Sequence, residues 1–198
     1  MTFIETIPED AASGAVAELY AHERETYGYV PNFTRAFSQR PEVYAAWRGL
    51  NVSIRSGMDL RRYELATVAA ARRLRSSYCL LAHGSILADQ HLAPDAVRAV
   101  VADHHAAADA LDEVDVAVMD LADKVADDAT SVTEGNLERL RALGLTDGEI
   151  FDVVAAAAAR CFFSKVLDAL GVQADARFAA LEPDLRDALT PGRPIAST

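Results

Sequence analysis

Residues 59–90 read DLRRYELATVAAARRLRSSYCLLAHGSILADQ, and this stretch predicts two consecutive helices with a short break between them. Asp59 is a good N-terminal cap, and the apolar residues that follow it recur at helical spacing. The first helix is expected over 60–74, where it ends among arginines that a helix C-terminus favours. The second is expected over about 78–88. This helix pair lies at the centre of the predicted fold.

The chemically distinctive residue of this stretch is Cys79, close to the start of the second helix. If Ser76 or Ser77 caps that helix, Cys79 is its second or third residue, where unpaired backbone amides favour a thiolate. His83 follows one turn later on the same face and can exchange protons with the thiol. Glu64, on the preceding helix, can hold the imidazole tautomer or act as a proton shuttle. Cys79, His83 and Glu64 are therefore the candidate catalytic residues.

Each member of this group also has a purely structural interpretation. A lone buried cysteine acts as a small hydrophobic residue. His83 can be an ordinary core or surface histidine, and Glu64 can pair with Arg61. Arg72, Arg73 and Arg75 can cap the first helix, although they would favour the thiolate if they faced the sulfur.

The rest of the chain is helical in pattern, and no strand-like run is evident. Further helices are expected over about 13–26, 41–55, 94–102, 113–125, 133–144 and 147–170, with shorter ones near 174–181 and 183–189. Thr146 and Glu149 have the spacing of a capping box, and Tyr44, Trp47 and Leu50 are expected in the core. The predicted architecture is a single all-α domain over 1–198, with an extended arm at 1–12 and a frayed tail at 190–198.

Composition limits the possible partners. The chain is 51% hydrophobic, enough for a sizeable core, and carries a formal charge of −11. This balance argues against nucleic acid as the main partner, because phosphate binding needs a basic surface. The acidic residues gather between 103 and 134 and are expected to form a solvated helix face. Two cysteines make no disulfide framework, and neither a signal peptide nor a membrane span is evident, so a cytoplasmic location is expected.

The spacing Glu64, eleven residues, Ser76, two residues, Cys79, three residues, His83 resembles the signature of the alkylhydroperoxidase (AhpD-like) and carboxymuconolactone decarboxylase superfamily. Redox members carry a second cysteine where Ser76 stands here. Further similarity to the peroxidase-related branch extends over most of the chain, in 29–33, 38–42, 59–64, 143–147 and 168–172. The resemblance implies an AhpD-like multi-helix bundle, a redox activity without a cofactor, and self-association into a homo-oligomer.

Carried over from the family, Cys79 would attack a peroxide and become a sulfenic acid, with His83 and Glu64 as proton relay. Ser76 cannot supply the resolving thiol. Three outcomes remain open: a one-cysteine peroxidase recycled by an external thiol, resolution by Cys161 if its Cα lies about 4.4–6.8 Å away, or loss of redox activity. Ser76, Tyr78 and Cys161 are candidates for supporting roles at the site.

Two functions besides peroxide reduction stay open at this level. Glu64 and His83 can serve as general acid and base on a small carboxylated substrate, as in the related decarboxylases, with an arginine of 72–75 binding the carboxylate. The chain can also be a non-catalytic helical module. A metal site is not expected: Cys79, His83 and Glu64 lack a fourth ligand, and His104 and His105, adjacent on a helix, should point apart.

Overall fold

The computed structural model describes residues 2–107 and 109–197, and this part of the chain is helical with no strand. In chain order its α-helices are α1 (Gly14–Tyr27), α2 (Asn32–Phe37), α3 (Pro41–Ser56), α4 (Leu60–Arg73), α5 (Ser77–Gln90), α6 (Pro94–Ala102), α7 (Glu113–Asp128), α8 (Glu134–Ala142), α9 (Asp147–Ala169) and α10 (Pro183–Ala188). Over the described ranges, no helix has the length and apolar character needed to cross a membrane. The predicted all-α class is confirmed.

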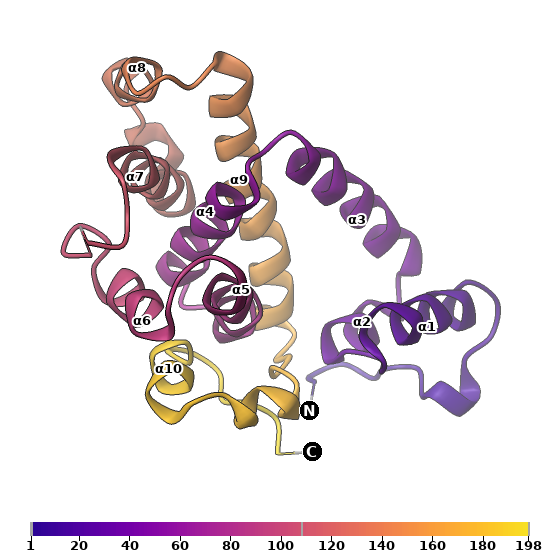
Figure 1. The fold of residues 1–198 in the computed structure, drawn as a ribbon. Helices are drawn as coiled ribbons and strands as arrows, with labels where there is room; N and C mark the ends of the chain where they lie inside the picture. Colours follow the sequence, from indigo (N-terminus) through magenta and orange to yellow (C-terminus); the bar gives the residue numbers. More distant parts are fainter. Residues whose placement is uncertain (1, 108, 198) are drawn as a thin grey trace.

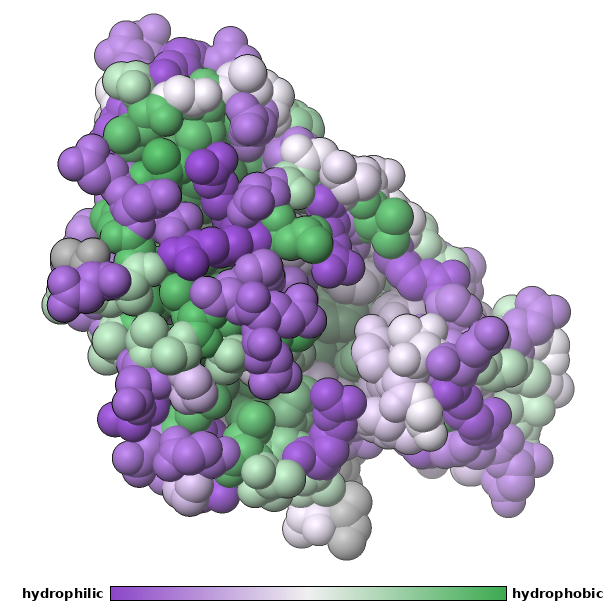
Figure 2. Space-filling view, in the orientation of Figure 1, coloured by the Kyte–Doolittle hydropathy of each residue, from purple (hydrophilic) through white to green (hydrophobic). Residues whose placement is uncertain are grey.

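Helix α4 lies at the centre of the molecule. It packs against α5, α7 and α9, and every side chain from Tyr63 to Ala71 is buried. The middle of α4 is therefore covered by neighbours on all its faces, while arginines lie near both of its ends. Helices α1 to α3 form a lobe on one side, in which α3 leans on α9 (Figure 1). The surface is hollowed between this lobe and the bundle (Figure 2).

The helix ends in the central region follow the predicted chemistry. The Asp59 carboxylate accepts the Arg62 N–H at 3.1 Å at the start of α4. Thr146 and Glu149 form the predicted capping box at the start of α9. Gly171, just past the end of α9, has φ +72°, a conformation that favours glycine. These caps fix the start of α4 and both ends of α9.

Two details of the lobe differ from the sequence prediction. Helix α2 was not predicted, because six residues after Pro31 are too few to show a periodic pattern. Leu50 is 53% exposed, whereas Tyr44 is 3% exposed. The prediction of a core position for Leu50 is wrong because α3 packs along one side only and stands away from the bundle on the other (Figure 1).

The C-terminal segment is ordered rather than frayed over residues 190–197. The Gly192 N–H donates to Ser77 Oγ at 2.8 Å, and Arg75 Nη2 donates to the Pro191 carbonyl at 2.9 Å. Ala196 is buried and donates its N–H to a carbonyl of the segment that follows α9. The prediction is wrong because these backbone groups find partners on other elements instead of in a helix of their own. Residue 198 lies outside the described residues.

The acidic stretch around α7 is also more than a solvated face. Asp115 is 2% exposed and accepts two hydrogen bonds from Arg61, at 3.0 Å from Nε and 2.7 Å from Nη2. Asp123 and Asp127 pair with arginines near the end of α4. The carboxylates of α7 therefore tie this helix to α4.

Candidate active site

The break between α4 and α5 places Cys79 in the first turn of α5. Arg75 adopts a left-handed conformation with φ +55° and turns the chain, and Leu80 N–H bonds the Ser76 carbonyl at 3.0 Å. Helix α5 begins at Ser77, so Cys79 is its third residue, within the predicted range. The Ser76 side chain makes no hydrogen bond to the helix amides. Ser76 thus occupies the N-cap position, as predicted, without a capping hydrogen bond from its side chain, and the Ser77 hydroxyl binds the C-terminal segment.

The sulfur of Cys79 meets two donors from α9. The Ser164 hydroxyl donates to Sγ at 3.1 Å, and Arg160 Nη1 donates to Sγ at 3.6 Å. Residues 160 and 164 are one turn apart and share a helix face. Cys79 is 1% exposed, Arg160 3% and Ser164 0%. The sulfur is thus enclosed, but its immediate neighbours are polar and one of them is charged.

Arg160 is a buried cation that keeps its charge. Burial would lower its pKa, but the electrostatic interaction with Cys79, followed by that with Tyr63, leaves the pKa raised. The guanidinium carbon lies 5.9 Å from the Trp47 ring centroid and 5.6 Å from that of Phe163. Aromatic faces at these distances favour a cation. The positive charge beside the sulfur therefore comes from α9.

The arginines expected near the sulfur have other partners. Arg72 pairs with Asp123 and Arg73 with Asp127. Arg75 donates to a carbonyl of the C-terminal segment. Because these three arginines contact other groups, the structure does not support the expectation that they favour the thiolate form of Cys79.

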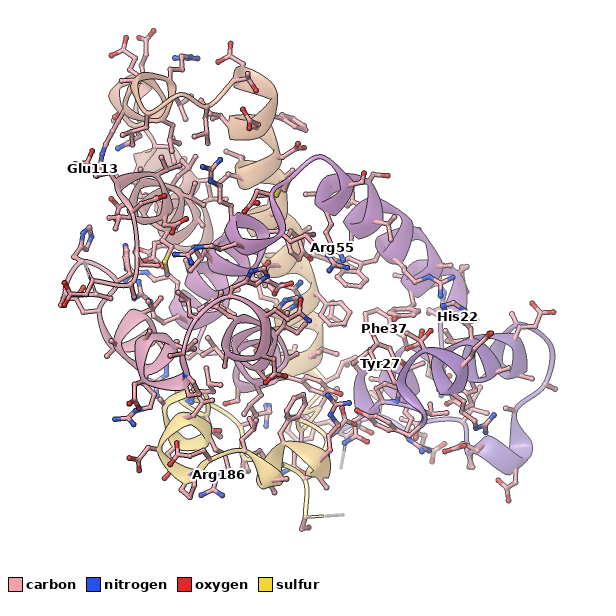
Figure 3. All side chains as sticks on the ribbon, viewed as in Figure 1. His22, Tyr27, Phe37, Arg55, Glu113 and Arg186 are labelled. Atoms are coloured by element: carbon pink, nitrogen blue, oxygen red, sulfur yellow. The ribbon has the colours of Figure 1, made fainter. Side chains whose placement is uncertain are left out.

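His83 and Glu64 are brought together as the spacing predicted. His83 Nδ1 lies 2.6 Å from Glu64 Oε2, across the α4–α5 contact. The Glu64 side chain is 2% exposed and that of His83 15%. Tyr63 lies edge-on to His83 at 6.1 Å, and Arg55 stands over the Tyr63 ring at 5.8 Å. Arg55 projects from α3 toward this side of the bundle (Figure 3).

The pKa shifts of the pair define its protonation state. Burial would raise the pKa of Glu64, but His83 and then Arg160 and Arg55 outweigh it, so the pKa is lowered. Burial, followed by the charge of Arg160, lowers the pKa of His83. Near neutral pH this leaves an ionised Glu64 and a neutral imidazole. The carboxylate then accepts from Nδ1–H, which leaves Nε2 of His83 free to accept a proton.

The three supporting candidates have different surroundings. Tyr78 is buried; it donates its hydroxyl proton to Asp175 and accepts the Phe33 N–H. Burial raises the pKa of Cys161, which is half-buried; both cysteines are free thiols. The Ser76 hydroxyl is buried and has no hydrogen-bond partner among the described residues. The contacts of Tyr78 connect it to other parts of the fold.

Sequence reasoning did not assign roles to Arg160 and Ser164. They lie more than 80 positions from Cys79, in the alanine-rich helix α9. One signal was available: Arg160 is a single charge between five alanines and a Cys-Phe-Phe run, in a segment apolar enough to be buried.

A second histidine cluster lies away from Cys79. His104 Nε2 and His105 Nε2 each approach Asp120 Oδ1 at 2.9 Å. The expectation that the two histidines point apart is wrong because they lie in a turn after α6, not within a helix. The three ligand atoms lie within 4.8 Å of one another. However, Arg72 lies 3.1 Å from His104 Nδ1, and Arg139 donates to Asp120. The guanidinium groups of these two arginines therefore supply the positive charge that a metal ion would bring to this cluster.

The comparisons with solved structures identify the fold. An uncharacterized peroxidase-related protein with an alkylhydroperoxidase AhpD core from Ralstonia eutropha JMP134 matches with a TM-score of 0.80 and 22% identity, over 89% of this chain and 94% of that one. A peroxidase-related protein from Silicibacter sp. TM1040 matches with a TM-score of 0.75 and 20% identity, over 90% and 91%. The chain therefore has the AhpD-like fold.

A third similar structure is an enzyme of different named activity. The debrominase Bmp8, as a cysteine-to-alanine variant in complex with 2,3,4-tribromopyrrole, matches with a TM-score of 0.71 and 15% identity, over 93% of this chain and 94% of that one. No protein-family model and no curated protein matches the sequence.

Proposed function

We propose that this protein is a peroxidase-related thiol enzyme that reduces small organic hydroperoxides through Cys79. The observation that carries the proposal is the environment of the sulfur, which accepts a hydrogen bond from the Ser164 hydroxyl and faces the Arg160 guanidinium. Cationic and hydrogen-bonding neighbours, together with the first turn of a helix, are the features that make a cysteine nucleophilic. The similarity to two peroxidase-related proteins agrees with this chemistry.

The proposed first step is a two-electron transfer from sulfur to peroxide. The Cys79 thiolate attacks one peroxide oxygen, so an S–O bond forms while the O–O bond breaks. The departing alkoxide takes a proton and leaves as an alcohol. His83 and Glu64, 2.6 Å apart and one helical turn beyond the cysteine, form the relay that accepts the thiol proton and returns one to the alkoxide. Cys79 becomes a sulfenic acid.

The second half of the cycle needs an external thiol. One thiol condenses with the sulfenic acid, which releases water and gives a mixed disulfide. A second thiol then attacks this disulfide, regenerates Cys79 and leaves as the oxidised reductant. Ser76 cannot replace the external thiol, because a hydroxyl group forms no disulfide. Cys161 is the only alternative resolving thiol that the sequence contains.

The test measures turnover and oxidation state together. Wild-type protein is mixed with cumene hydroperoxide and a dithiol reductant, and Cys79 is read by mass spectrometry after trapping of sulfenic acid. We expect Cys79→Ser to abolish turnover and Cys161→Ser, the matched control, to retain it. Undiminished turnover in Cys79→Ser would disprove the proposal.

A second candidate function rests on the same histidine and glutamate. His83 is more exposed than Cys79, and its neutral imidazole is oriented by Glu64. These are the requirements of a general base acting on a small carboxylated substrate, without a thiol cycle. This function predicts an activity that survives alkylation of both thiols and is lost in His83→Ala. Loss of activity on alkylation favours the peroxidase; no activity in either assay favours a non-catalytic helical module.

A further inference from the structure

Arg160 differs from most buried arginines in having no carboxylate at salt-bridge distance among the described residues. It is 3% exposed, and its Nη1 donates to Cys79 Sγ at 3.6 Å. A buried charge is costly unless it is paired and hydrogen-bonded. The remaining donors of the guanidinium therefore require an explanation.

The unused donor lies on the edge of the guanidinium away from the sulfur contact. Arg160 Nε is buried and has no hydrogen-bond partner. Nε and Nη2 form the side of a guanidinium that binds a carboxylate through two parallel hydrogen bonds. We infer that this edge of Arg160 is a binding site for the carboxylate of a small organic acid, held directly beside Cys79.

A second buried donor supports the inference independently. Trp47 Nε1 is also buried without a partner. The Trp47 ring stacks on Phe163 at 4.0 Å between centroids, and the Arg160 guanidinium lies 5.9 Å from the Trp47 centroid. Buried donors without partners are rare in native proteins and indicate a missing water, ion or ligand. Two such donors around one aromatic pair fit an anionic ligand with an apolar body.

The charges around the site leave room for one anion. Arg160 and Arg55 both act on Glu64 and on His83, whose own imidazole is neutral near pH 7. Two cations face one carboxylate, so the surroundings of Cys79 favour an added negative charge, whether it is a thiolate or a bound carboxylate.

This inference names the substrate class of the proposed enzyme and uses the proposed function only in taking Cys79 as the reacting atom. A carboxylate on the Nε edge is held by the same guanidinium that contacts the sulfur. The ligand is therefore oriented relative to the nucleophile, as effective catalysis requires. The preferred hydroperoxides are those that carry a carboxylate group.

Trp47 makes the inference testable without chemistry, because it is the only tryptophan of the chain. Benzoate and the neutral, similarly shaped benzamide are each titrated into the protein while Trp47 fluorescence is followed. We expect saturable binding of benzoate and binding of benzamide that is at least about tenfold weaker, because the amide lacks the charge that strengthens a bidentate contact. Equal affinities for the two probes, or no saturable change with benzoate, would overturn the inference.

Three variants separate this inference from the proposed function. Arg160→Lys keeps the charge but removes the planar fork, and should weaken benzoate binding about tenfold or more. Arg55→Gln removes the neighbouring, exposed cation and should change the affinity by less than about threefold. Cys79→Ser should still bind benzoate although it cannot turn over peroxide. Unchanged binding in Arg160→Lys contradicts the carboxylate site even if Cys79 reacts with peroxide.

Discussion

The protein contains two sites in which a histidine, a carboxylate and an arginine meet, and they are built in opposite ways. At His104 the imidazole lies between Arg72 and Asp120, and Asp120 also binds His105 and Arg139. At His83 the imidazole has Glu64 as its partner, whereas the arginine of that site, Arg160, faces a cysteine sulfur. At the first site every arginine named has a carboxylate partner within the protein, whereas at the second site Arg160 has none at salt-bridge distance over the described ranges.

The difference distinguishes a structural network from the proposed catalytic site. Arg72 pairs with Asp123 as well as His104, so it links α4 to α7. Arg160 keeps an unpartnered Nε in the interior next to a thiol. Structural ion pairs and catalytic groups use the same residue types. The partners of the charged residues, rather than the residue types, distinguish the His104 site from the His83 site.

The largest expected contrast comes from removing the carboxylate charge at each site. Glu64→Gln should lower peroxide turnover by about 100-fold, because the oriented proton relay is lost. Asp120→Asn should leave turnover within about threefold of wild type and instead lower the free energy of unfolding by about 1–2 kcal/mol, through weakened hydrogen bonds. Steady-state kinetics and urea denaturation of both variants test this. Equal losses of turnover would remove the distinction between the sites.

An intermediate contrast is expected when each arginine is replaced by methionine. Arg72→Met strands the partly buried Asp123 and should cost about 2 kcal/mol of unfolding free energy. Arg160→Met removes a buried charge that has no carboxylate partner, and should change stability by less than about 1 kcal/mol in either direction. Denaturation midpoints with a common m-value provide the measurement. A large destabilisation in Arg160→Met would mean that Arg160 is a structural residue.

The smallest contrast lies in the pH dependence of stability. In the folded protein the pKa of His83 lies below its ordinary value of 6.5, mainly because the side chain is buried. Just below pH 6.5 the histidine therefore binds a proton more readily in the unfolded chain than in the folded protein. Stability should therefore fall as pH drops from 6.5, and further below 4.5, where the lowered pKa of Glu64 adds its loss. Asp120, lowered from 3.8, contributes only at still lower pH.

Two variants show which histidine site causes the loss of stability as the pH falls. His83→Gln should flatten the decline between pH 6.5 and 4.5 in chemical denaturation, whereas Asp120→Asn should leave that part of the curve in place. An unchanged slope in His83→Gln would show that the histidine is protonated equally in the folded and unfolded states.

Local chemistry predicted much of the fold and the first half of the candidate site. Asp59 and the Thr146–Glu149 pair bond their own helices, so the signal lies within a few residues. The contact of Glu64 with His83 also followed from two adjacent helices. Arg160 could not be placed in this way, since only the packing of α9 against α5 brings it to the sulfur. The short helix α2 and the turn that joins His104 to His105 were missed because neither has a periodic pattern.

The docking of the C-terminal segment on the α4–α5 junction has a consequence for how this sequence can vary. A methyl group at Gly192 would lie 2.1 Å from the backbone oxygen of Arg75, and the Gly192 N–H is bonded to the first residue of α5. Insertions, bulky replacements or fusion linkers between 190 and 193 would therefore displace the start of α5, the helix that carries Cys79. Natural variation and engineered tags face the same restriction there, although the segment contributes no reacting group.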